Sequence, residues 1–119
     1  MSAGHYDFTI EQGANFSKTI TWKDQAGAGI NIHGYTIRMM ARNEYTDAAP
    51  VITLSTVPAI GGISITDEAN GVFALSMTAA QTAALNFSLL KYDLEVQSPE
   101  GVVTRLLEGS ISLSKEVTR

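Results

Sequence analysis

Alternation between apolar and polar side chains, with a period of two residues, constrains this sequence more than any other feature. Alternate side chains of a β-strand point to opposite faces of a sheet, so this pattern predicts strands with one buried face. The alternation is clearest where Leu90, Tyr92, Leu94 and Val96 are separated by charged residues. Similar alternation marks segments 6–11, 16–22, 35–42, 51–54, 63–66, 72–77 and 102–113. The sequence therefore predicts about seven to eight short strands.

Turn and edge signals separate these segments. Residues 67–71 end in Asn-Gly, which accepts the positive φ angles of a tight hairpin turn. Residues 98–101 have proline second and glycine fourth, as in a type I turn. Leu106 and Leu107 break the parity of the last strand, which predicts a bulge there. Lys18 lies on the apolar side of its strand, so we expect that strand near an edge where the ammonium reaches water.

One short helix is expected among the strands. Thr78 and Gln81 have the spacing of a capping box, and an alanine-rich stretch follows. We predict a helix over about 78–85. A helix of this length is marginal by itself, so it must dock on a sheet. The residues expected to make that contact are Ala80, Ala83, Ala84 and Leu85.

Closely spaced strands with few helices between them favour an all-β, antiparallel β-sandwich. A short helix before a tyrosine-bearing strand also occurs where immunoglobulin-like chains cross between their two sheets. We therefore expect an immunoglobulin-like β-sandwich with its helix at about 78–85. The 119 residues suit a single domain, 1–119, in which 1–5 and 115–119 are extended tails.

Charged residues make up 17% of the chain, below the ~25% of typical domains. Two explanations stay open: a surface covered by neighbouring proteins, or the Thr and Ser that β-structure favours. The net charge is −4 and the basic residues are scattered singly, so we expect no nucleic-acid partner. Without cysteine there are no disulfides or thiolate metal sites. We find neither a signal-peptide pattern nor an apolar run of ~18 residues, and so expect no membrane partner and a protein made in the cytosol.

Residue patterns that carry chemistry are few. His5 and His33 lie far apart, and residues 67–70 lack the ligand spacing of a calcium loop. Residues 27–29 form a lone Gly-x-Gly with no following helix, which is too little for a nucleotide loop. No Gly-x-Ser-x-Gly elbow occurs. We therefore predict no enzyme, no catalytic residue, no cofactor, no metal and no small-molecule substrate.

Two features are candidate partner-binding sites. Arg38, Met40 and Arg42 share one strand face, and Met and Arg are enriched in protein interfaces. The alternative for Met40 is that the loop 43–50 covers it. Tyr45, in that loop, is either an anchor or a sugar-stacking ring, or else it packs back on its own domain. Lys91, Asp93 and Glu95 are interpreted as surface charge.

Five segments carry a resemblance to a known family. They are Tyr6–Gly13, Thr21–Asp24, Gly34–Met39, Tyr92–Glu95 and Val103–Gly109. In this order they resemble small virion proteins of tailed bacteriophages and prophages, over nearly the whole chain. They are also similar in pattern to the N-terminal β-domain of siphophage upper baseplate proteins. The resemblance implies an immunoglobulin-like or related sandwich without a catalytic motif, assembled in symmetric copies.

On this basis we expect a structural subunit of a virion, a tail, baseplate or head-to-tail accessory protein assembled in the host cytoplasm. Its partners would be other virion proteins and copies of itself, bound by strand addition at an exposed sheet edge. A capsid decoration or head-fibre protein is the nearest alternative. A carbohydrate-binding module is an alternative from another class, and it predicts two or more exposed aromatic rings in a row.

Overall fold

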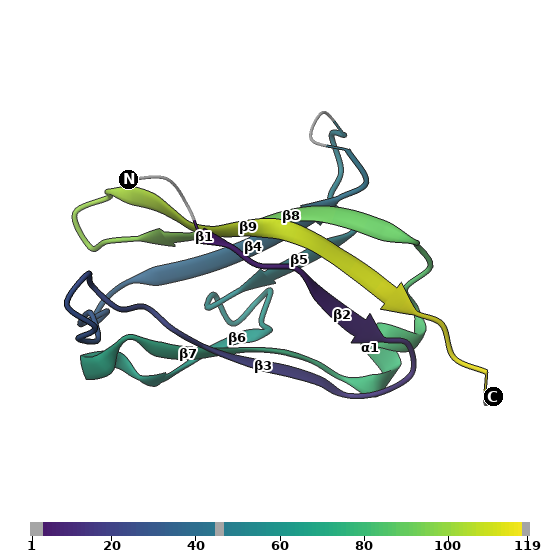
Figure 1. The fold of residues 1–119 in the computed structure, drawn as a ribbon, viewed down its shortest axis with the longest axis horizontal. Coiled ribbons are helices and arrows are strands. Elements are labelled where there is room, and N and C mark those ends of the chain that lie inside the picture. The colour runs from purple at the N-terminus through teal and green to yellow at the C-terminus, as the bar shows by residue number, and fades with distance from the viewer. Residues whose placement is uncertain (1–3, 45–46, 118–119) are drawn as a thin grey trace.

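The computed structural model describes residues 4–44 and 47–117, which form two β-sheets and one short α-helix (Figure 1). The strands are β1 (Gly4–His5), β2 (Phe8–Glu11), β3 (Phe16–Thr21), β4 (Thr36–Arg42), β5 (Ile52–Ser55), β6 (Ile63–Asp67), β7 (Val72–Met77), β8 (Leu89–Gln97) and β9 (Val103–Ser114). The helix α1 (Ala79–Ala83) lies between β7 and β8. None of the helices in these ranges is long and apolar enough to cross a membrane.

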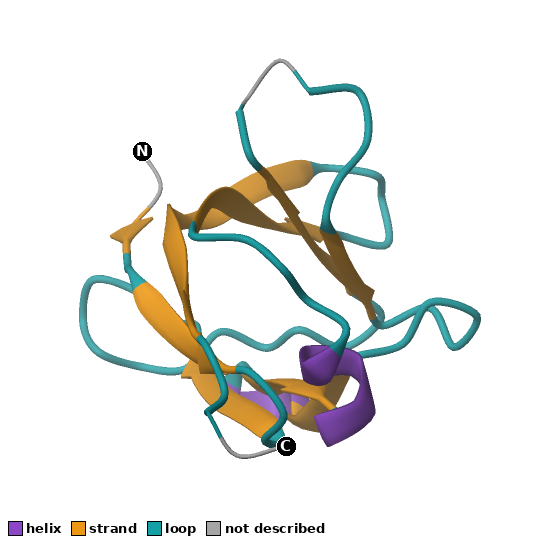
Figure 2. Cartoon of the chain, turned by 90° about the vertical axis from the view of Figure 1, so that its right-hand side faces the viewer, coloured by secondary structure: helices purple, strands orange, loops and turns teal. Residues whose placement is uncertain are grey.

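One sheet has six strands in the order β1-β9-β8-β4-β5, with β2 also paired to β9. The other has three, in the order β3-β7-β6. Figure 2 shows the two layers from the end that carries α1. Their facing sides form one core, with Ile37 and Leu94 from the larger sheet and Phe73 and Leu75 from the smaller one. The predicted two-sheet, mostly β architecture is confirmed.

The larger sheet is mixed, so the prediction of a wholly antiparallel arrangement is wrong. β1 and β2 run parallel to β9, with Gly4 opposite Leu107 and Phe8 opposite Ile111. Side-chain alternation reports which face of a strand is buried and carries no information on strand direction. Residues Gly4–His5, expected to belong to an extended tail, are part of this pairing.

A local irregularity separates β1 from β2. The Tyr92 hydroxyl donates a hydrogen bond to the Tyr6 carbonyl at 2.5 Å. Beside this irregularity, the N–H of Ser110 in β9 donates to a side chain, the Asp7 carboxylate, at 2.8 Å. This hydrogen bond lowers the pKa of Asp7. A side chain at Gly109 would overlap the Tyr6 carbonyl oxygen. The close approach of the two backbones therefore requires glycine at this position.

The capping box predicted at the start of the helix is confirmed. The Thr78 hydroxyl accepts from the N–H of Gln81, and the Gln81 side chain accepts from the N–H of Thr78. The predicted docking contacts are partly wrong, because Ala80, Ala83 and Ala84 are exposed. The buried contacts are Thr82 and Leu85, of which Thr82 has no exposed surface.

The bulge predicted in the last strand is confirmed. Arg105 pairs with Glu95 and Leu107 pairs with Leu94, which leaves Leu106 as the extra residue. The hairpin turn predicted at 67–71 is confirmed, because β6 and β7 pair antiparallel on either side of it, but its form differs from a tight Asn-Gly turn. Residues Glu68–Asn70 form a 3₁₀ turn, and of this segment only Gly71 has a positive φ, 72°.

Lys18 lies on an edge strand, as predicted. β3 pairs with β7 on one side, and the Lys18 ammonium lies 4.8 Å from the centre of the Tyr6 ring. The favourable contact between a cation and an aromatic face explains how a charged side chain is accommodated on the apolar side of the strand.

Candidate docking surface

Strand β4 places Arg38, Met40 and Arg42 on the outer face of the larger sheet. Burial alternates along the strand, with Ile37, Met39 and Ala41 fully covered in the core. Three of the four predicted partner-binding residues therefore share one face, as the alternation predicted. The fourth, Tyr45, lies outside the described residues.

Arg38 makes a short cross-strand ion pair on this face. It is opposite Glu95 of β8, and its Nε and Nη2 donate to the same carboxylate oxygen at 2.9 and 2.8 Å. The two side chains are 45% and 26% exposed. An ion pair this accessible to solvent contributes about 0.2–1 kcal/mol, so it positions the arginine more than it stabilises the fold.

Met40 and Arg42 form a second contact along β4. The Arg42 Nη2 lies 3.7 Å from the Met40 sulfur, while its Nε donates to the Asp47 carbonyl at 2.9 Å. Arg42 therefore lies against the thioether, and the loop after β4 holds that arginine in place. Arg42 thus links Met40 to Asp47 of the loop that the alternative explanation placed over this methionine.

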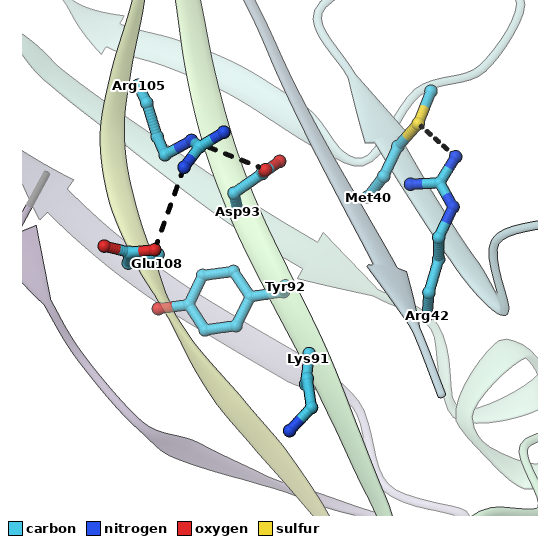
Figure 3. Close-up of a pocket in the computed structure, with 7 residues that line it drawn as sticks. All are labelled: Met40, Arg42, Lys91, Tyr92, Asp93, Arg105 and Glu108. Atoms are coloured by element: carbon cyan, nitrogen blue, oxygen red, sulfur yellow. Dashed lines mark hydrogen bonds and ion pairs between the residues drawn. The ribbon is translucent and has the colours of Figure 1, made fainter. Parts of the chain in front are cut away.

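A shallow hollow of about 110 Å³ opens beside these residues (Figure 3). Its lining consists of Met40, Arg42, Lys91, Tyr92, Asp93, Arg105 and Glu108. Arg105 extends between two carboxylates, with its Nε 3.6 Å from Asp93 and its Nη1 3.9 Å from Glu108. Three cationic side chains and two carboxylates thus line the hollow together with one half-buried methionine.

The bulge at Leu106 builds the β9 side of this hollow. Arg105 and Glu108 are three positions apart, so in a regular strand their side chains would point to opposite faces. The extra residue resets the alternation, so that Arg105 faces outward beside Glu95 and Glu108 faces outward beside Asp93. Bulges commonly redirect side chains at functional sites in this way.

The carboxyl of Asp93 lies in an unfavourable environment for a charge. Partial burial raises its pKa above the usual range, and the nearby Glu95 carboxylate adds to the effect. The guanidinium groups of Arg105 and Arg42 oppose it. A further cation supplied from outside would favour the charged form of Asp93.

The sequence pattern predicts the β4 side of this surface but not its β9 side. Asp93 and Lys91 were interpreted as ordinary surface charge, although their parity already placed them on the outer face of the sheet. The spacing of Arg105 and Glu108 hides the face that they share until the bulge is placed. If the alternation of β9 is shifted by one residue after the predicted bulge, Arg105 and Glu108 fall on the same outer face, and this shift is the signal in the sequence that identifies them.

A second groove, of about 420 Å³, separates the edges of β2 and β3. Tyr6, Phe8 and Phe16 line it as a stack, with ring centroids 5.9 and 5.5 Å apart and planes inclined by 20° and 18°. The rings turn their faces toward one another. They are therefore not arranged as the open row of aromatic faces that a carbohydrate platform needs.

A partner bound on the outer face of β4, β8 and β9 could form ion pairs with its charged side chains and would cover Met40. The carboxylates of Glu95 and Asp93 on this face are paired with Arg38 and Arg105. Within residues 4–44 and 47–117, no group of three or more His, Asp or Glu side chains is placed to hold a metal ion. No protein-family model matches the sequence, and no curated protein matches it significantly.

Proposed function

We propose that this chain is a structural subunit of a tailed-phage virion, which docks on neighbouring virion proteins through the outer face of β4, β8 and β9. The observation that carries the proposal is the composition of that face. Met40 and the cross-strand ion pairs lie on one surface, and methionine and arginine are both enriched in protein interfaces. The resemblance of five chain segments to small virion proteins supplies the biological setting.

The fold is, in this proposal, an immunoglobulin-like sandwich. Immunoglobulin domains place strands B, E and D in one sheet and G, F and C in the other, with C′ added in the variable type. The orders β3-β7-β6 and β9-β8-β4-β5 correspond to B-E-D and G-F-C-C′. The helix α1 lies at the crossing from β7 to β8, which corresponds to the E–F corner. The first strands depart from the constant-type pattern, since they pair with β9.

The position of the subunit in the particle is proposed to be the tail, the baseplate or the head-to-tail junction. A capsid decoration or head-fibre protein would use the same surface. Electron microscopy of particles assembled without this chain distinguishes these positions, because density is lost at the site that it occupies. Intact density at both head and tail would overturn the virion proposal.

The docking face is tested by complementation of such particles with variant chains. Met40→Asp replaces the methionine of this face with a charge, and it should abolish incorporation into particles. Ser64→Asp introduces the same charge on the outer face of the smaller sheet, where Ser64 is exposed, and it should be incorporated normally. Normal incorporation of Met40→Asp would show that another surface docks.

A carbohydrate-binding role has one observation in its favour. Trp22, packed edge-to-face on Tyr35, lines a mostly apolar hollow of about 520 Å³ beside Lys23, Asp24 and Gln25. Retention of the wild type on a polysaccharide column, lost in Trp22→Ala, would favour this role. Passage of the wild type without retention would remove it.

A further inference from the structure

We propose that two copies of this chain associate by antiparallel pairing of their β3 strands, which joins the two smaller sheets into one continuous six-stranded sheet. This inference rests on the proposed function as an assembling subunit, and it names the edge, the register and the partner. The argument depends on which sheet edges are open, where their backbone groups point and which charges would meet.

β3 is the most regular open edge in the described part of the chain. All six of its residues, Phe16–Thr21, pair in unbroken register with β7, and no strand pairs with its other side. β6 is interrupted by a register shift between Ile65 and Asp67. β5 is shorter, and its last residue, Ser55, already bridges to Gly62. A long unbulged edge is the usual template for strand addition.

The backbone direction of β3 follows from two hydrogen bonds. The N–H of Ser76 donates to the Gly62 carbonyl, which lies next to β6. The backbone N–H and C=O groups of Ser76 and of every second residue of β7 therefore point toward β6, and those of the residues between them point toward β3. The N–H of Trp22 donates to Gly71, which continues the same alternation past the end of β3. The N–H and C=O groups of Ser17, Thr19 and Thr21 therefore point outward from the free edge.

Electrostatics selects the register of the pair. In a symmetric antiparallel pair, opposite residues must present their side chains to the same face of the joined sheet. If most of β3 is also to be paired, only two registers remain. One places Lys18 directly opposite Lys18 of the second copy, and like charges in that position are destabilising. The other places Thr19 opposite Thr19, Lys18 opposite Ile20, and Phe16 opposite Trp22. The second register avoids the repulsion and adds two aromatic cross-strand pairs.

The outer face near this edge carries no charge that would repel a second copy. The residues that β3 and β7 present outward are Ser17, Thr19, Thr21, Val72, Ala74 and Ser76. The outer face of the larger sheet differs, since charged side chains of both signs cover it. Inward-pointing lysines often protect sheet edges, but the Lys18 ammonium is held over the Tyr6 ring of its own chain.

The test measures the mass of the purified full chain by size-exclusion chromatography with light scattering, from micromolar to sub-millimolar concentration. The wild type should reach the mass of two chains. Thr19→Lys and Thr19→Glu should each remain monomeric with an unchanged circular dichroism spectrum, because Thr19 is exposed. An equimolar mixture of the two variants should regain the dimer mass, since opposite charges then meet across the two-fold axis. Ser64→Lys, on the far strand of the same sheet, should dimerise like the wild type.

A wild type that stays monomeric at every concentration would overturn the inference, as would a dimer that survives in both Thr19 variants. Failure of the mixed variants to pair would overturn the Thr19 register. Thr19→Pro is a second variant, which removes the outward N–H without disturbing the ladder to β7, and it should weaken the dimer at least about tenfold. A monomeric wild type, together with density missing from particles assembled without the chain, would overturn the dimer and leave the virion proposal standing. A dimeric wild type, together with intact density in those particles, would overturn the virion proposal and leave the dimer standing.

Discussion

Thr82 joins the helix to the loop between β2 and β3 through a single hydroxyl group. Its Oγ1 donates to the Ala14 carbonyl at 2.8 Å and accepts from the N–H of Gly13 at 3.0 Å. It also lies 3.1 Å from the carbonyl of Ala79 in its own helix. A buried hydroxyl with several partners specifies one docking position for so short a helix.

Replacing Thr82 by valine should lower the free energy of unfolding by about 1–3 kcal/mol, because it leaves buried backbone groups without their partner. Urea titration followed by circular dichroism measures the change. Ala83→Ser introduces a hydroxyl on the exposed side of the same helix, and should change stability by less than about 0.5 kcal/mol. Equal stabilities for the two variants would contradict the role assigned to Thr82.

Tyr92 makes stability depend on alkaline pH. Burial raises the pKa of its hydroxyl well above the usual 10.0, with smaller contributions from Asp7 and Tyr6. Above pH 10 the unfolded chain releases this proton while the folded chain retains it, so rising pH favours unfolding. The wild type should lose up to about 1.4 kcal/mol per pH unit more than Tyr92→Phe. Urea midpoints of both proteins between pH 8 and 11 test this, and parallel curves would contradict it.

The β9 strand shows how much the sequence alone could predict at the level of elements. Alternation located the strands and their buried faces, and the parity break located the bulge. Strand direction was missed, because β2 has the same side-chain pattern whether it pairs parallel or antiparallel. The docking residue of α1 was missed because Thr82 reads as a polar surface position until its partners in another loop are known.

For the candidate surface, the sequence supplied one strand of three. Arg38, Met40 and Arg42 lie on the predicted face. Arg105 and Glu108 reach it only because the bulge shifts their parity, and their partners on β8 follow from pairing between distant segments. Local patterns specify faces, whereas the neighbours on those faces depend on the topology.

Gly109→Ala tests the contact between the first strands and β9. The added methyl group would overlap the Tyr6 carbonyl and lie close to the Asp7 carboxylate, so β1 and β2 must move away from β9. Hydrogen exchange of the β2 amides should become at least about tenfold faster, with a loss of stability of about 1–3 kcal/mol. Ser110→Ala, which keeps the backbone N–H that bonds Asp7, serves as the control and should exchange like the wild type.

At the scale of the whole molecule, the two sheets share one core, so we expect them to unfold together. Phe73 has no exposed surface and belongs to the cluster that both sheets form. Phe73→Ala should lower stability by about 3–5 kcal/mol. The fluorescence of the single tryptophan, Trp22, and the far-ultraviolet circular dichroism should shift to the same new urea midpoint.

Val102→Ala provides the control for this change. Val102 is 64% exposed at the tip of the β8–β9 hairpin, so its truncation should move the midpoint little. Separate transitions for fluorescence and circular dichroism in any of these proteins would show that the two sheets unfold independently.

The pairing of β2 with β9 also has a consequence during protein synthesis. Phe8 and Ile111 are neighbours in the finished sheet, yet about a hundred residues separate them along the chain. Translation at roughly 5–20 residues per second leaves the nascent β2 without its partner for on the order of 10 s. During that time its apolar face is available to chaperones or to other nascent chains. β2 leaves the ribosome well before β9 and is therefore expected to be among the last strands to reach its native position.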